Sequence, residues 1–292
     1  PSLLMMVGAV INVVLDPIFI FGLGGVPRFG LVGAGIAGTI ARGFLCAAMV
    51  AIVWRRDRML SFTPPSAREA IDSWRRILHV GLPAAGTNMV IPLSSGVVTA
   101  LIATFGAEAV AGFGVATRIE SVALVFFFAL SGVMNPFVGQ NAGARRLDRV
   151  REAMRQCGVF CLGFGAAMAL LLGLLAPWLV APFNRDPGVM AVAVDYLRLA
   201  PLGYGAAGVV MVVNASFNGL GRPLPAAFIS VLRVIVVYLP LAFAGSRLFG
   251  VAGIFAAAAL ANAAVGALAY RLHQRAVGAP PAAEMAPAVD AA

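Results

Sequence analysis

Two polar side chains, Asn12 and Asp16, interrupt the apolar segment INVVLDPIFIFG at residues 11–22. They are four residues apart, so a helix would place both on one face. Pro17 follows directly, and a proline inside a helix removes a backbone hydrogen bond and kinks the chain. An ionised aspartate in hydrocarbon costs about 2.5–3.5 kcal/mol on insertion scales, so such residues usually face water or a partner. Asp16 is therefore a candidate proton or cation site; an aspartate that only caps a broken helix is the alternative.

A second acidic side chain, Glu120, lies with Arg118 in the apolar segment ATRIESVALVFFF, residues 116–128. Residues two apart point to different sides of a helix, so this glutamate and arginine do not simply pair. Glu120 is a candidate for proton or cation binding, and an ion pair with another helix is an equal alternative. Two further arginines lie in apolar segments: Arg233 near the end of one, where its side chain can reach the interface, and Arg42 deeper, without an evident partner.

Other familiar patterns in the chain are explained by packing. Residues 33–38, GAGIAG, match a dinucleotide fingerprint, but they run into an apolar helix with no preceding strand, so close helix packing is expected. Cys157 and Cys161 lack a nearby histidine or acidic cluster that would complete a metal site. His79 and His273 lie at predicted helix ends without companions. We expect neither an enzyme nor a metal or organic cofactor.

The composition indicates a membrane protein. Hydrophobic residues make up 61% of the 292 residues, charged residues 11%, and the mean hydropathy is +0.94. Ordinary soluble domains have about 25% charged residues, so the lipid bilayer is the expected surrounding. The net charge of +9 comes from 21 basic residues, all arginine, placed between apolar runs. Loop charges that set membrane topology explain this excess better than nucleic-acid binding does.

The expected fold class is all-α, a polytopic membrane helix bundle with about eight spans. The predicted spans are residues 2–24, 30–54, 80–104, 109–138, 157–182, 189–216, 224–245 and 249–272. The expected organisation is two spans in 1–56, a cytoplasmic amphipathic linker in 57–79, six spans in 80–273 and a disordered tail in 274–292. Within the linker, Ile71, Trp74, Ile77 and Leu78 share one helix face, as in an interfacial helix.

Arginines mark alternate ends of the predicted spans. They follow the even-numbered spans, in segments 55–76 and 145–155, at Arg222, and at Arg271 with Arg275. Because short basic loops stay in the cytoplasm, these ends and the C-terminus are expected to face inward, in a multi-pass protein of the cell inner membrane. The first predicted span then runs outward, and Asp16 lies in its outer half.

An internal repeat relates the two ends of the chain. Residues 13–41 align with residues 236–261 through Val-Val, a proline and Phe-Gly, with one short gap. Secondary transporters often contain such repeats, and their sites lie near the repeat interface. Asp16 aligns with Leu239, so the repeated scaffold does not require an acid at this position.

Five segments resemble signatures of the multidrug and toxic compound extrusion (MATE) family of secondary transporters. They are NVVLDPIFIFGLG (12–24), GLPAAGTNMVIPL (81–93), VATRIESVA (115–123), NPFVGQNAGA (135–144) and NASFNGLGRPLP (214–225). The resemblance implies the two-lobe inverted-V fold of that family, which has twelve spans in two lobes of six. The chain would then comprise spans five to twelve, with an incomplete N-lobe.

The resemblance also implies roles for particular residues. In the branch of the family with an N-lobe site, an Asn and an Asp four apart on the fifth span help to form the proton site, and Asn12 and Asp16 match that pattern. Thr39 is the match for a threonine of the sixth span. The sodium-coupled branch uses acids at positions that here are Ile91 and about Ala207, which favours H⁺ over Na⁺ as the coupling ion.

The implied function is secondary active efflux, in which amphipathic and cationic compounds are exchanged for protons by a protein that is a monomer when complete. One alternative is a lipid-linked oligosaccharide flippase of the same superfamily, which Arg42 and Arg118 keep open because such proteins carry basic residues in a central cavity. Another is a fragment that does not transport.

Overall fold

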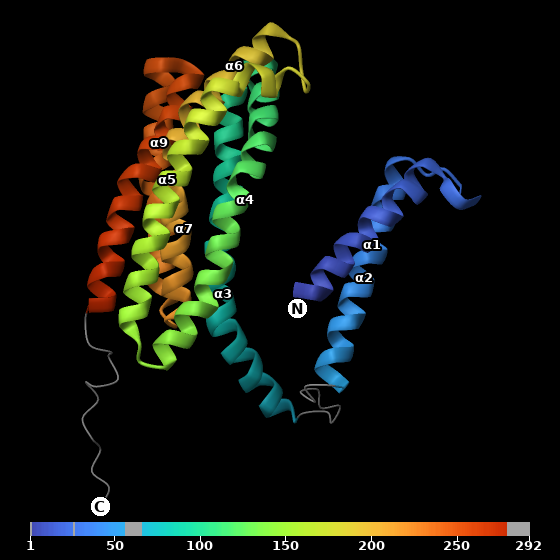
Figure 1. Ribbon diagram of the computed structural model, residues 1–292, viewed down its shortest axis with the longest axis vertical. Helices are drawn as coiled ribbons and strands as arrows, with labels where there is room; N and C mark the ends of the chain where they lie inside the picture. The colour runs from blue at the N-terminus through green and yellow to red at the C-terminus, as the bar shows by residue number, and fades with distance from the viewer. Residues whose placement is uncertain (1, 26, 56–65, 279–292) are drawn as a thin grey trace, which may run out of the picture. The chain divides into compact units, whose positions relative to one another are not determined.

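The computed structural model describes residues 2–25, 27–55 and 66–278, and these are helical almost throughout (Figure 1). The chain divides into two compact units, Pro1–Arg75 and Arg76–Ala292. The first unit contains two long apolar helices, and the second contains a larger bundle with its own core. The expected all-α membrane architecture is confirmed.

The first unit is built on the hairpin of α1 (Ser2–Phe21) and α2 (Leu31–Arg55), joined by the short 3₁₀ turn η1 (Leu23–Gly25). Pro17 lies inside α1, and the helix continues on both sides of it. The connection folds back because the Phe29 amide donates to the Phe19 carbonyl at 3.1 Å. Gly30 follows with a φ of 57°, a backbone conformation that glycine adopts without strain.

The second unit begins within α3 (Ala67–Ala103), which starts in the first unit. It continues with α4 (Ala107–Gly143), α5 (Leu147–Val180), α6 (Pro187–Leu199), the 3₁₀ turn η2 (Ala200–Gly203), α7 (Tyr204–Gly219), α8 (Pro223–Val231), the π-helix η3 (Leu232–Tyr238) and α9 (Leu239–Gly278). α7 packs against α4, α5 and α9, and most of its side chains are buried. Phe127, Phe217 and Phe255 are the largest buried side chains of this core.

Glycines let the helices of the second unit approach closely. A side chain at Gly165 would collide with the backbone of Gly205, and one at Gly208 would collide with the Phe127 ring. Small residues at such crossings are typical of membrane helix bundles, where packing rather than water exclusion drives association.

Six helical stretches of the described residues are long and apolar enough to cross a membrane. The difference from the eight predicted spans has two causes. The predicted span 80–104 lies within α3, where the described apolar stretch is only Pro92–Ala103. The last two predicted spans lie on one stretch, Pro223–Val277, which is about 80 Å of helix and far longer than one crossing requires. Gly250, with a φ of 62°, breaks this stretch into two helices.

The predicted linker falls partly on residues 56–65, which lie outside the described residues. From Ala67 onward it is helical and continuous with α3. Ile71, Trp74 and Ile77 are each more than 60% exposed, as an apolar helix face without a protein partner would be. At the other end of the chain α9 continues to Gly278, past the predicted start of the tail at 274, and residues 279–292 lie outside the described residues.

Candidate functional site

Asn12 and Arg42 line a cavity of about 230 Å³ between α1 and α2. The other lining residues are Met5, Gly8, Ala9, Gly38, Ala41 and Leu45. Gly38 makes room for the Asn12 amide, whose nitrogen lies 3.8 Å from where a side chain at Gly38 would begin. The structure therefore brings a predicted site residue together with the unexplained arginine of the neighbouring helix, a pairing that the sequence analysis missed.

Asp16 lies one turn beyond Asn12 on α1 and is half-buried. Within the described part of the chain it has no hydrogen bond or ion pair, and it does not line the cavity that Asn12 lines. Thr39 is exposed on α2, where its hydroxyl donates to the Gly35 carbonyl at 2.8 Å. The proton-binding role of these residues stays a prediction.

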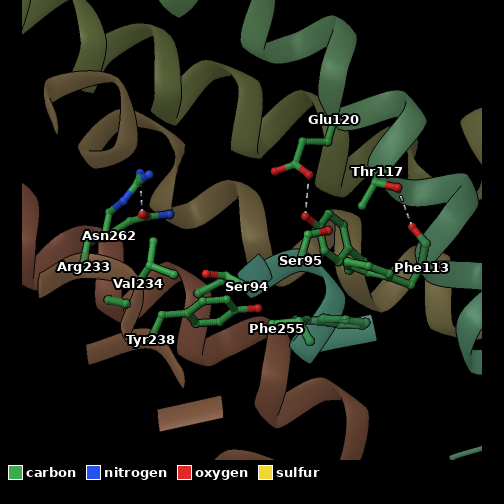
Figure 2. A pocket seen from close by; sticks show the side chains of 14 residues that line it. Ser94, Ser95, Phe113, Thr117, Glu120, Arg233, Val234, Tyr238, Phe255 and Asn262 are labelled. Atoms are coloured by element: carbon green, nitrogen blue, oxygen red, sulfur yellow. Dashed lines mark hydrogen bonds between the residues drawn. The ribbon is translucent and has the colours of Figure 1, made fainter. Parts of the chain in front are cut away.

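The second unit contains a larger cavity of about 290 Å³, which we call the C-unit cavity (Figure 2). Helices α3, α4, α6 and α9 and the π-helix η3 all contribute to its walls. The lining residues are Ser94, Ser95, Val98, Phe113, Thr117, Glu120, Tyr196, Arg233, Val234, Tyr238, Phe255, Ala258, Ala261 and Asn262. Glu120 is thus a cavity residue, and it belongs to a different unit from Asp16.

Glu120 is held by a tyrosine rather than by a cation. Its Oε2 accepts a hydrogen bond of 2.6 Å from the Tyr196 hydroxyl, across the α4–α6 contact. Tyr238 lines the same cavity as this carboxylate. The ion pair considered as an alternative for Glu120 is absent among the described residues. Arg118, two residues away, is exposed.

Arg233 lines the C-unit cavity, whereas the sequence analysis considered only that its side chain could reach the membrane interface. Its Nη1 lies 3.5 Å from Oδ1 of Asn262, and its Nε is buried with no hydrogen-bond partner among the described residues. Arg233 faces the cavity because it lies in the π-helix η3, where side chains point in other directions than in an α-helix. The residue types around it do not indicate this irregular turn.

His273 is also placed differently from the expectation of a helix-end residue without companions. It is fully buried, its Nε2 lies 2.7 Å from the Ser216 hydroxyl, and its ring packs edge-on against Phe217 at a centroid distance of 5.5 Å. The pair joins α9 to α7. Among the described residues no group of three or more His, Cys, Asp or Glu side chains could hold a metal ion.

The two positions of the sodium-coupled pattern carry no acid. Ala207 is buried in α7, and the side chain of Ile91 lies outside the described part of the structure.

Comparisons with known proteins agree with this architecture. Residues 83–244 match the model of the MatE protein family. A FAD transporter of Shewanella oneidensis is 33% identical over 94% of this chain and 61% of its own length. A probable multidrug resistance protein NorM of Thermotoga maritima is 25% identical over 82% of this chain and 51% of its own length.

A solved structure shows the same fold. The Vibrio cholerae MATE transporter VcmN in its bent form superposes with a TM-score of 0.80 at 32% identity, covering 95% of this chain and 62% of that one. The chain thus spans between about half and three fifths of the length of these relatives.

Proposed function

Since the chain belongs to the MatE family, whose relatives are membrane transporters rather than enzymes, we propose that it serves secondary active efflux of small amphipathic compounds in exchange for protons. The arginine-rich segments and apolar helices support a multi-pass protein of the inner membrane with a cytoplasmic C-terminus.

The observation that carries the proton-coupling proposal is the placement of Asp16. The carboxylate lies on an apolar helix, half-buried and without a partner among the described residues, with the Asn12 amide one turn away. A lone carboxylate at membrane depth is unfavourable when ionised and dry, and favourable when water reaches it. Its charge can therefore follow the access of water to its side of the protein.

Coupling follows if the protonated and ionised forms of Asp16 stabilise different conformations. Protonation then shifts the population toward the conformation that binds the proton more tightly. The size of the shift is set by the ratio of the proton affinities of the two conformations. A membrane potential adds about 2.3 kcal/mol per charge per 100 mV, which is enough to bias such an equilibrium. Substrate would leave the cell in one state and the proton would enter in the other.

The test is Asp16→Asn in the complete coding sequence, assayed as pH-gradient-driven export of a cationic dye from vesicles. We expect export to be abolished while the protein still inserts into the membrane. Leu239→Asn, at the aligned position of the repeat, is the matched control and should leave export unchanged. Unchanged export by Asp16→Asn would contradict the proposal. Export driven by a sodium gradient would show that the coupling ion is Na⁺ rather than H⁺.

A second candidate substrate class is anionic, because an arginine lines each cavity: Arg42 in the first unit and Arg233 in the second. The relative from Shewanella oneidensis, a FAD transporter, supports this candidate. Competition between FAD and a cationic dye for export separates the two classes. An anionic lipid precursor as a third competitor tests the flippase alternative.

A further inference from the structure

We propose that the C-unit cavity is a binding site for small aromatic anions, in which Arg233 holds a carboxylate or phosphate and the aromatic walls hold the ring. This site lies wholly in the second unit and does not depend on proton coupling through Asp16.

The strongest observation is the unmet hydrogen-bonding capacity of Arg233. A guanidinium has five N–H donors and no acceptor. One of them makes a long contact of 3.5 Å with the neutral Asn262 side chain, and the buried Nε has no partner among the described residues. No carboxylate of the described residues lies within ion-pair distance of Arg233. A charged group whose buried Nε has no partner and that has no counter-charge is unfavourable, so an anion in the cavity would relieve this cost.

Glu120 does not supply that counter-charge. Figure 2 shows Arg233 and Asn262 on one side of the cavity and Glu120 on the other. The glutamate carboxylate already accepts the Tyr196 hydroxyl at 2.6 Å. The acid of the cavity therefore has a donor, whereas the arginine has only one long contact with a neutral acceptor, and this asymmetry favours an anionic ligand over a cationic one.

The local backbone explains why Arg233 faces the cavity. Arg233 and Tyr238 both line it and are five residues apart. In an α-helix two such residues point about 140° apart around the axis. The π-helix η3, whose hydrogen bonds join residues five apart, places them on one face. Asn262 on α9 binds the guanidinium through its oxygen, which leaves its amide nitrogen as a further donor.

The remaining walls fit an aromatic ring. Phe113 and Phe255 stack with ring planes 11° apart and centroids 6.2 Å apart, and Tyr196 packs edge-on against Phe255 at 4.9 Å. Ala258 and Ala261 also line the cavity and have short side chains. The volume of about 290 Å³ is at the lower end of known ligand sites. A ligand of one or two fused rings bearing a single anionic group fits this size and polarity.

The test measures binding of four naphthalene probes to the 292-residue chain in lipid nanodiscs by titration calorimetry, with empty discs as the blank. The probes are 1-naphthoate, 1-naphthyl phosphate, neutral 1-naphthamide and 1-naphthylmethylammonium. We expect at least one anion to bind about tenfold or more tightly than the amide, because a hydrogen bond to a charged group contributes strongly to affinity. The preferred anion distinguishes carboxylate from phosphate recognition. Equal affinity for anions and amide, or tightest binding of the ammonium probe, would overturn the proposal.

Variants assign the effect to Arg233. Arg233→Gln should lower anion affinity to that of the amide and leave amide affinity unchanged, whereas Arg247→Gln, at an exposed position of α9, should change neither. Asn262→Asp places a carboxylate beside the guanidinium and should lower anion affinity even if Arg233→Gln does not fold. Unchanged anion affinity in a folded variant of either Arg233 or Asn262 contradicts the assignment.

Discussion

Two hairpins share a scaffold but differ in their polar groups: the first is α1 with α2, and the second is η3 with the part of α9 before Gly250, followed by the part of α9 after it. Gly30 and Gly250, which align in the repeat, both have positive φ, at 57° and 62°. Three residues later, Gly33 and Gly253 each lie where a side chain would collide with a backbone carbonyl of the preceding helix. The repeat therefore specifies how each hairpin turns and how closely its helices cross.

The buried faces of the two second helices also correspond. Gly33, Ala37 and Ala41 are the buried residues of α2. Their aligned residues Gly253, Ala257 and Ala261 are buried in α9. A stripe of small residues spaced by four lets the paired helix approach closely in both hairpins.

The polar residues do not follow the repeat. The first hairpin has asparagine on its first helix and arginine on its second, Asn12 and Arg42. The second has the reverse order, Arg233 and Asn262, and Asp16 is replaced by Leu239. Small residues and turn glycines therefore define the shared hairpin, whereas each copy carries its own set of polar residues.

The largest expected effect is that of substituting Asp16, which tests whether this acid serves transport or the fold of the hairpin. Asp16→Leu gives the first hairpin the residue that the second already has, so the helix should insert at least as well, since an ionised aspartate costs about 2.5–3.5 kcal/mol at the centre of a membrane helix. We expect complete loss of pH-driven export with normal membrane insertion, measured in vesicles and by membrane fractionation. The reciprocal Leu239→Asp should insert less well. Failure of Asp16→Leu to insert would show that the acid belongs to the scaffold.

The next largest effect tests the shared helix crossings. Gly33→Ala and Gly253→Ala each place a methyl group against backbone that cannot move easily, and overpacking of this kind costs about 1–3 kcal/mol. Both variants should lower the free energy of unfolding by similar amounts, measured by denaturation in mixed micelles. Gly35→Ala, with open space around it, is the control and should have little effect. Unequal losses at Gly33 and Gly253 would argue against a common scaffold.

Much of the scaffold was predictable because its determinants are local. Apolar runs predict membrane helices, and the aligned Phe-Gly pairs of the repeat precede the two glycines of positive φ. The number of spans was less accessible. A hydropathy window counts Pro223–Val277 as one stretch, whereas the sequence analysis predicts two spans there, 224–245 and 249–272, and the backbone breaks at Gly250, near their boundary.

The polar contacts were not predictable because their partners are distant in the sequence. Glu120 bonds to Tyr196, 76 residues away, and His273 bonds to Ser216, 57 residues away. The orientation of Arg233 depends on a π-turn for which residue type offers no rule. Sequence reasoning identified Glu120 as a candidate, since an acid in an apolar helix stands out, but serine and tyrosine are too common to indicate contacts by themselves.

A smaller effect tests how the second hairpin is attached to its bundle. The Ser216–His273 pair ties α9 to α7, whereas the residue equally far past the end of the aligned repeat in the first hairpin is the apolar Val53. Ser216→Ala removes the only recorded partner of the His273 ring nitrogens within the described chain and should lower the free energy of unfolding by about 1–3 kcal/mol. Ser246→Ala is the control, because that hydroxyl donates only to the Phe243 carbonyl of its own helix. Equal stability of the two variants would show that packing alone anchors α9.

The smallest effect concerns α3, whose first turn is held by a cap, in contrast to the packed crossings of both hairpins. The Ser66 amide and hydroxyl donate to Glu69 Oε2 at 2.9 and 2.8 Å, and the Glu69 amide donates to the Ser66 hydroxyl at 3.4 Å, a reciprocal capping box. These bonds, the one from the Ser66 backbone first, lower the pKa of Glu69 below its usual range.

A lowered pKa means that the cap stabilises the helix start above the pKa that Glu69 has in the unfolded chain, and that this stabilisation is lost as pH falls through the lowered value. Amide hydrogen exchange of the first turn, corrected for intrinsic rates, should therefore show protection that falls on the order of twofold between neutral pH and pH about 3. Glu69→Gln retains an acceptor without the titrating charge, so its protection should not depend on pH. The same pH dependence in Glu69→Gln would assign it to another titrating group and would contradict a charge-dependent cap at the start of α3.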